Sequence, residues 1–141
     1  MVARISVNER EFIDELVEDV VHSAEEVAAT LGGGFERDVY ERALSRELGL
    51  RGRSVRSQAS HPVFYKGALV GGYAADLIVA GRLAVDLDCA EQFSSDDLLQ
   101  CRNYVMASGM QIGLLIRFEG GRVHWEPVVN PEVQSVAAFR G

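Results

Sequence analysis

The sequence is poor in several residue types that mark particular classes of protein. It contains one lysine, Lys66, two cysteines and one tryptophan among 141 residues. No apolar run approaches the ~20 residues that a membrane span needs, and the N-terminus leads into an acidic amphipathic stretch in place of the apolar core of a signal peptide. Cys89 and Cys101 stand at no zinc-ligand spacing with the three histidines. We therefore expect a reduced, cytoplasmic protein with no membrane segment.

The shortage of lysine goes with an excess of acid. The net charge is -7 and the pI about 4.9. Nucleic-acid affinity depends largely on clustered Lys and Arg, so the overall charge disfavours a nonspecific nucleic-acid binder. Arg51, Arg53 and Arg56, beside Arg46, form a local exception that we interpret as a solvated loop. A hydrophobic content of 48% over this length predicts one globular domain, residues 1–141.

The first long element is a predicted helix over residues 8–31. Asn8 is expected to cap it, with Glu11 completing a capping box. Apolar residues recur along it at helical spacing, and the three glycines at 32–34 are expected to end it. These glycines do not indicate a phosphate-binding loop, because no apolar strand precedes them and no Gly-Lys-Ser/Thr follows.

Two shorter helices are predicted. One covers residues 35–48 and is expected to stop at Gly49. The other runs over residues 94–108, with Ser94 or Ser95 as its cap and two aspartates in the first turn, where the helix dipole favours anions.

The remaining periodicity is that of strands. Residues 53–65, 69–80 and 82–89 are rich in Val, Ile, Tyr and Phe and are separated by turn residues, which indicates three consecutive antiparallel strands. The nearly continuous apolar run at 112–116 indicates a central strand buried on both faces. With a last strand at 123–129, the order is ααβββαββ. This predicts an α+β fold with a central mixed sheet flanked by helices.

The C-terminal end is expected to lie at the edge of this sheet. We expect Pro127 and Pro131 to close the last strand, and residues 131–141 to form a loosely ordered tail. Trp125 and the edge strand at 123–129 leave room for pairing across a homodimer.

Several segments together resemble the GxxExxY family, a branch of the PD-(D/E)XK nuclease-like superfamily, over roughly residues 17–129. The segments that carry the resemblance are residues 31–35, 39–44, 64–67, 72–79 and 85–88, Gln100 with Asn103-Tyr104, and residues 113–118. The resemblance implies a restriction-endonuclease-like core and a site that binds Mg²⁺ or Mn²⁺.

The resemblance places the metal ligands at Asp76 and Asp86. A hairpin turn at Gly81 would bring the two carboxylates together across adjacent strands, and such hard oxygen ligands suit a divalent cation. The alternative is a pair of solvent-facing acids on alternating strands. It fits Asp76 badly, because that residue stands inside an apolar segment and burying a lone carboxylate is costly.

Two positions depart from the family pattern. The family has a lysine two residues after the second acid, where this chain has Asp88, and Lys66 belongs to a different turn. The motif glutamate between Gly34 and Tyr40 is replaced by Arg37.

Other residues that the resemblance implicates are retained. Gln100 and Tyr104 match the superfamily's motif on the third helix, and Tyr40 completes the glycine motif. The two replacements are reciprocal in charge, so we expect Arg37 and Asp88 to form an ion pair and divalent cations to bind weakly or not at all.

Three functional hypotheses follow. The first is a degenerate nuclease-like domain, without catalysis, that acts as a binding or assembly module. The second is a divergent metal-dependent nuclease in which Asp76, Asp86 and Asp88 hold the metal and Arg37 stabilises developing charge. The third is a partner-binding fold with no link to nucleic acid, which the acidic net charge favours over a nonspecific nucleic-acid binder.

Overall fold

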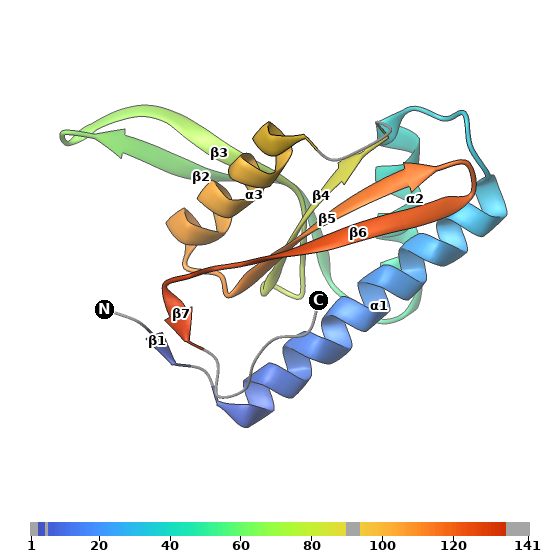
Figure 1. Ribbon diagram of the computed structural model, residues 1–141, viewed down its shortest axis with the longest axis horizontal. Coiled ribbons are helices and arrows are strands. Elements are labelled where there is room, and N and C mark those ends of the chain that lie inside the picture. Colours follow the sequence, from blue (N-terminus) through green and yellow to red (C-terminus); the bar gives the residue numbers. More distant parts are fainter. Residues whose placement is uncertain (1–2, 5, 90–93, 135–141) are drawn as a thin grey trace.

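The computed structural model describes residues 3–4, 6–89 and 94–134. Its centre is a five-stranded sheet in the order β2-β3-β4-β5-β6 (Figure 1). The strands are β2 (Val55–Tyr65), β3 (Ala68–Val79), β4 (Leu83–Asp88), β5 (Ile112–Glu119) and β6 (Arg122–Val129). The β4–β5 pair is parallel and the other pairs are antiparallel, so the sheet is mixed as predicted.

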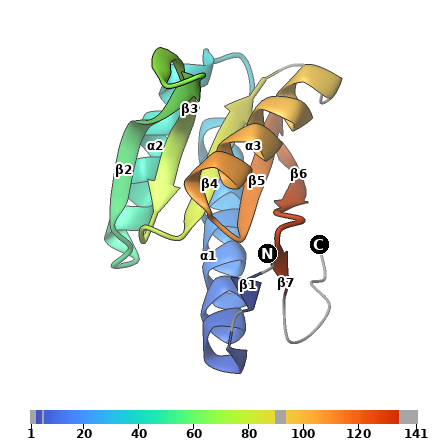
Figure 2. The ribbon, with the colours of Figure 1, turned by 90° about the vertical axis from the view of Figure 1, so that its left-hand side faces the viewer.

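Three helices cover the two faces of this sheet (Figure 2). α1 (Val7–Leu31) and α2 (Arg37–Leu50) pack on one face, where they share a core with Leu77, Val85 and Leu114. α3 (Ser95–Ser108) packs on the other face and connects the parallel strands β4 and β5. None of the helices in the described part of the chain is long and apolar enough to cross a membrane.

The strand predicted to be central does lie inside the sheet. β5 runs between β4 and β6, and seven of its eight residues are buried. Since helices cover both faces, neither face of this strand needs polar residues, which explains the unbroken apolar run in the sequence.

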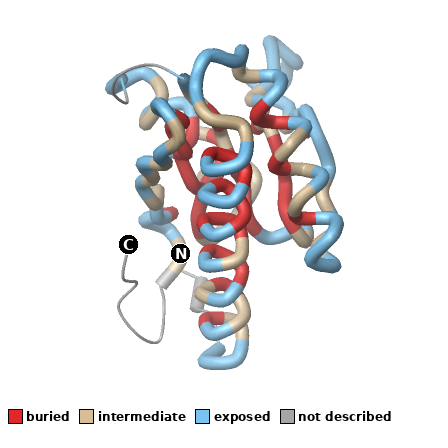
Figure 3. The backbone as a smooth tube through the Cα atoms, turned by 90° about the vertical axis from the view of Figure 1, so that its right-hand side faces the viewer, coloured by how far each residue is buried: buried red, intermediate tan, exposed pale blue. Residues whose placement is uncertain are grey.

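α1 is amphipathic along its whole length. Its buried residues face the sheet and its exposed residues face solvent, as the alternating colours along the helix in Figure 3 show. The predicted cap at Asn8 is wrong, because Ser6 is the N-cap and accepts a hydrogen bond from the N–H of Glu9 at 3.1 Å. The spacing of the apolar residues predicted that a helix forms here, but it did not determine whether Ser6 or Asn8 is the N-cap.

The ends of the other helices are decided by local geometry. α2 continues through Gly49 to Leu50, so the predicted stop at Gly49 is wrong. The chain turns instead at Gly52, whose φ of +82° is the left-handed conformation that glycine accepts readily. The cap of α3 is Ser94, which forms a capping box with Asp97.

The C-terminal strand differs from the expectation in two ways. Pro127 does not end β6 but lies within it, opposite Leu114, and an edge strand tolerates a residue that lacks an N–H. In addition, a short strand that was not expected, β7 (Val133–Gln134), pairs in parallel with β1 (Ala3–Arg4), while the loose order of residues 131–141 stays a prediction. The rest of that predicted tail, residues 135–141, lies outside the described residues.

Candidate functional site

The two carboxylates that the sequence singled out lie together where β3 and β4 separate. The ladder between these strands ends at Leu77 opposite Val85, one residue before Asp76 and Asp86. Beyond this pair, the hydrogen bonds between β3 and β4 are made by side chains. The N–H of Asp76 donates to Oδ1 of Asp86 at 3.1 Å, and the N–H of Leu87 donates to Oδ2 of Asp76 at 2.8 Å. The carboxylates therefore hold the two strands together at this point.

The pairing of β3 with β2 is interrupted at the same level. Gln58, which would pair with Asp76, has a φ of +50°, a conformation that is costly for a residue with a side chain. Its side-chain amide donates to Oε1 of Glu41 on α2 at 2.9 Å. The pairing of β3 with both neighbouring strands is therefore interrupted at Asp76, and the side chain of Asp76 can contact α2.

The residue of α2 that contacts Asp76 is Arg37, the first residue of the helix. Its Nη1 lies 2.9 Å from Oδ1 of Asp76 and 3.0 Å from Oε1 of Glu41, and its Nη2 lies 3.0 Å from Asp38. Burial opposes the charge on Arg37, but the negative charges of Asp76, Glu41 and Asp38 outweigh it and raise the pKa of the guanidinium. Arg37 is therefore a cation held by three acidic side chains.

The expected ion pair between Arg37 and Asp88 is wrong, because the strand carboxylate that Arg37 contacts is that of Asp76. Asp88 lies two residues beyond Asp86, which places it roughly 6.6 Å farther along β4. It is directed toward α3. Although burial acts to raise the pKa of Asp97, hydrogen bonds, one of them with Asp88, lower it.

Asp86 lies on the α3 side of the site. Burial raises its pKa to about 6, and the hydrogen bond from the N–H of Asp76 only partly offsets this effect. The thiol of Cys101 on α3 hydrogen-bonds to Asp86, and the pKa of that thiol is raised by its burial and by the carboxylate charge. The site therefore contains a carboxyl group that takes up a proton near pH 6.

Of the two α3 residues that the family motif implicates, Tyr104 is buried and Gln100 is not. Gln100 is exposed, whereas Cys101 and Tyr104, one helical turn apart, are buried against the sheet. The ring of Tyr104 makes an edge-on contact with His61 at 6.4 Å between centroids. Burial raises the pKa of Tyr104, with an opposing effect from Arg56.

Tyr40 and the glycine loop fix the start of α2. Tyr40 is buried, donates a hydrogen bond from its hydroxyl to the carbonyl of Gly32 at 2.6 Å, and stacks on Phe118 at 4.5 Å. A Cβ on Gly33 would lie only 3.1 Å from the Cα of Gly120, so a side chain there would press against the turn between β5 and β6. This anchoring sets the position from which Arg37 reaches Asp76.

Sequence reasoning missed Glu41, Gln58 and Cys101. Glu41 could have been found, because it follows Arg37 by one helical turn and so shares its face. Cys101 likewise follows from its spacing to Tyr104. Nothing in the sequence announces the positive φ of Gln58.

The implied divalent cation does not fit the side chains as they stand. Three of the four oxygens of Asp76 and Asp86 already accept protein donors, one of them the Arg37 guanidinium. Within the described residues no three His, Cys, Asp or Glu side chains are grouped so that they could hold a metal ion. Asp88, the third predicted ligand, points toward α3. The oxygens of Asp76 and Asp86 are thus largely occupied by donors of the protein itself.

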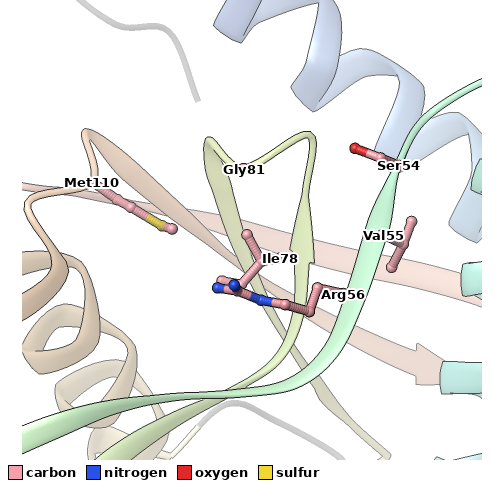
Figure 4. A pocket seen from close by; sticks show the side chains of 6 residues that line it. All are labelled: Ser54, Val55, Arg56, Ile78, Gly81 and Met110. Carbon is pink, nitrogen blue, oxygen red and sulfur yellow. The ribbon is translucent and has the colours of Figure 1, made fainter.

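A pocket of about 330 Å³ lies at the turn between β3 and β4 (Figure 4). It is lined by Ser54, Val55, Arg56, Ile78, Gly81 and Met110. Figure 4 shows the guanidinium of Arg56 pointing into it. Arg56 also affects the pKa of Tyr104, so the pocket adjoins the α3 side of the site.

Comparison with solved structures gives one match with a TM-score above 0.5, which indicates a shared fold, and one below it. The structure titled "Crystal structure of SSO0001" has a TM-score of 0.53 at 14% identity and is matched over 67% of this chain, which spans half the length of that protein. An alkaline exonuclease, LHK-Exo from Laribacter hongkongensis, has a TM-score of 0.47 at 11% identity, over 80% of this chain and 82% of the exonuclease. Comparison with curated proteins gives no match.

The sequence itself matches the family model of the PD-(D/E)XK nuclease superfamily over residues 14–128, from within α1 to the penultimate residue of β6. The match covers most of the chain, including both carboxylates, α2 and α3. Nucleases of this superfamily generally use divalent metals. The protein belongs to the PD-(D/E)XK nuclease superfamily.

Proposed function

We propose that this protein is a catalytically inactive member of the superfamily, in its GxxExxY branch, that acts as a binding or assembly module. The observation that carries the proposal is the ion pair of 2.9 Å between Arg37 and Asp76. A protein guanidinium does not lose its proton near neutral pH, so this cation stays with the carboxylate.

The residue that replaces the family's lysine supports the same conclusion. Asp88 adds negative charge where the family pattern has a cation. The chain's lysine, Lys66, lies in the β2–β3 turn with its ammonium 5.3 Å from the ring centre of Tyr65. No lysine is therefore available to orient a water molecule or to offset charge at the site.

The competing hypothesis is a divergent nuclease with Asp76, Asp86 and Asp88 on the metal and Arg37 as an electrostatic stabiliser. It requires that Arg37 release Asp76. It also requires that the side chain of Asp88 turn toward Asp76 and Asp86. The contacts of both residues favour the inactive alternative.

Calorimetric titration with Mn²⁺ tests the proposal at the residue that carries it. The wild-type protein should bind Mn²⁺ weakly or not at all, because the guanidinium competes for the carboxylate. Arg37→Glu replaces the competing cation by a further oxygen ligand, and we expect it to raise the affinity at least about tenfold. Arg42→Glu is the matched control, since Arg42 is an exposed arginine on the same helix, and it should leave affinity unchanged.

A nuclease assay tests the same proposal directly. Single-stranded and double-stranded DNA and RNA should stay intact with Mg²⁺ or Mn²⁺ and the wild-type protein. Metal-dependent cleavage that disappears in Asp76→Ala would refute inactivity and support the divergent nuclease. Equal Mn²⁺ affinity of the wild type and Arg37→Glu would show that Arg37 does not control the site.

A further inference from the structure

The pocket at the turn between β3 and β4 differs in composition from the carboxylate site. Its charged residue is Arg56, whose guanidinium points into it (Figure 4). Arg56 lies opposite Ile78 in the β2–β3 ladder, and Ile78 belongs to the core on the α3 face of the sheet. Residues opposite each other in a ladder project from the same face, so Arg56 also lies on the α3 face. None of the six lining residues is an acid, and neither Asp76 nor Asp86 is among them.

The positive charge of Arg56 is not neutralised by the part of the protein that the structure describes. Arg37, Arg51 and Arg53 each form an ion pair with an acid. Within residues 3–4, 6–89 and 94–134, Arg56 forms none. Its guanidinium donates a hydrogen bond to the hydroxyl of Tyr104. A guanidinium has five N–H donors and stays charged near neutral pH, so Arg56 retains both charge and donors for a ligand.

The other walls of the pocket are largely apolar. Ile78 is 2% exposed, Val55 and Met110 are half-buried, and Gly81 contributes only backbone. Ser54 is the second residue with a polar side chain. A mostly apolar lining with one or two placed polar groups is typical of small-molecule sites, whose volumes range over roughly 300–1,000 Å³. The volume of about 330 Å³ therefore suits a small ligand.

Hydrogen bonds between separate segments hold the walls of this pocket in place. The N–H of Ala80, in the β3–β4 turn, donates to the carbonyl of Ser54 at 2.8 Å and so joins the turn to the start of β2. The buried side chain of Asn130 donates to the carbonyl of Met110 at 2.8 Å and so fixes the segment that follows α3. The pocket is therefore formed before a ligand binds, which lowers the entropy lost on binding.

We propose that this pocket binds a small monocarboxylate with a compact apolar body, such as a short branched-chain or aromatic acid. The carboxylate lies on Arg56, because a guanidinium can hold a carboxylate through two parallel hydrogen bonds. The apolar part of the ligand packs against Ile78 and Met110. This inference goes beyond the proposed function, since it does not depend on the state of Asp76 and Asp86.

The charge of the pocket favours a ligand with one negative charge. A phosphate monoester carries close to two negative charges at neutral pH, and the pocket offers it one guanidinium. Nucleic acid is a poorer match still, because proteins that bind its backbone commonly neutralise about 6–10 phosphates and this chain has a net charge of -7. A monocarboxylate matches the single cation, and its apolar body covers the apolar walls.

A titration of the full chain with benzoate and with 4-methylpentanoate, followed by NMR of ¹³C-labelled methyl groups, tests the proposal. The methyl groups of Ile78 and Met110 belong to the pocket, whereas that of Ile13 lies in the core on the other face of the sheet. We expect shifts at Ile78 and Met110, none at Ile13, and a Kd of about 1 mM or tighter. Benzamide has nearly the same shape and no charge, so it should bind at least about tenfold more weakly.

Variants of Arg56 test the residue that carries the proposal. Arg56→Met removes the guanidinium and keeps much of the apolar stem, and it should lower the affinity for benzoate at least about tenfold. Arg56→Lys keeps the charge but loses the planar fork, so its affinity should lie between those of Arg56→Met and the wild type. Arg82→Met is the matched control, because Arg82 is exposed and follows Gly81 without lining the pocket. Circular dichroism checks that each variant is folded.

Three results would overturn the proposal: no methyl shift at tens of millimolar of either acid, equal affinity for benzoate and benzamide, or unchanged binding by Arg56→Met. Inorganic phosphate, single-stranded DNA or an acidic peptide that shifts the same two methyl groups at lower concentration would overturn it as well, because the ligand would then be of another class. The metal titration and the nuclease assay are run without these acids, so their outcome is independent of this one.

Discussion

The ion pair between Arg37 and Asp76 makes a prediction that a double-mutant cycle can measure. Arg37→Met removes the guanidinium and keeps much of the apolar stem, and Asp76→Asn removes the charge but keeps an oxygen that can accept the N–H of Leu87. Unfolding free energies of the wild type, the two single variants and the double variant give the coupling between the two side chains.

The magnitude follows from the geometry. Two unit charges about 4 Å apart attract by roughly 4 kcal/mol at the effective dielectric constant of a protein surface. The Arg37 side chain is 38% exposed and shares its Nη1 with Glu41, while that of Asp76 is 20% exposed. Solvent screening and this sharing reduce the coupling to about 1–2 kcal/mol. That value lies above the ~0.2–1 kcal/mol of exposed pairs and below the ~3–5 kcal/mol lost when a fully buried pair is broken.

Urea denaturation monitored by circular dichroism is the assay, and Asp88 provides the matched control. A second cycle with Arg37→Met and Asp88→Asn should be additive within about 0.5 kcal/mol, because Asp88 is directed toward α3. A coupling below about 0.5 kcal/mol for Asp76, or a larger coupling for Asp88 than for Asp76, would refute this account of the site.

Three further predictions concern stability. Asp86 has a pKa of about 6 in the folded protein against an ordinary 3.8, so the stability that its bound proton contributes is complete below pH ~3.8 and is lost as the pH rises through 6. The variant Asp86→Asn should therefore be more stable than the wild type by up to about 3 kcal/mol at pH 8 and by little at pH 3.5. Urea denaturation at both pH values measures the difference. Gly113→Ala should lower the free energy of unfolding by about 1–3 kcal/mol, because its Cβ would lie 2.6 Å from the sulfur of Cys101. Gly49→Ala, in a helix with open space around it, should raise the free energy of unfolding by about 0.5–1 kcal/mol. Equal effects of the two variants in thermal melts would contradict the packing of α3 on the sheet. Tyr40→Phe should cost about 1–2 kcal/mol, since it leaves a carbonyl of the glycine loop without its hydrogen bond, and an unchanged unfolding free energy would contradict that anchor.

The sequence by itself determined most of the fold. The helical spacing of apolar residues in α1, the alternation in β2–β4 and the continuous apolar run of β5 predicted the element order and the central strand, because burial patterns repeat with the period of the backbone. The ends were less secure. The cap at Ser6 and the continuation of α2 past Gly49 depend on hydrogen bonds and φ angles that no periodicity reports.

The candidate site was likewise predictable in part. The spacing of Asp76 and Asp86 around a tight turn was enough to bring them together, because the register of a hairpin follows from its turn. The partner of Arg37 was not predictable, since it depends on how α2 lies across the sheet. Only the tertiary structure decided that the pairing of β3 is interrupted at Asp76, where Gln58 has a positive φ, and that the Asp76 carboxylate contacts α2. Asp88, two residues beyond Asp86 on β4, points toward α3 instead. Strand and helix periodicities fix which face a residue occupies, whereas the meeting of side chains from separate elements depends on packing angles and local distortions that arise only when the whole core assembles.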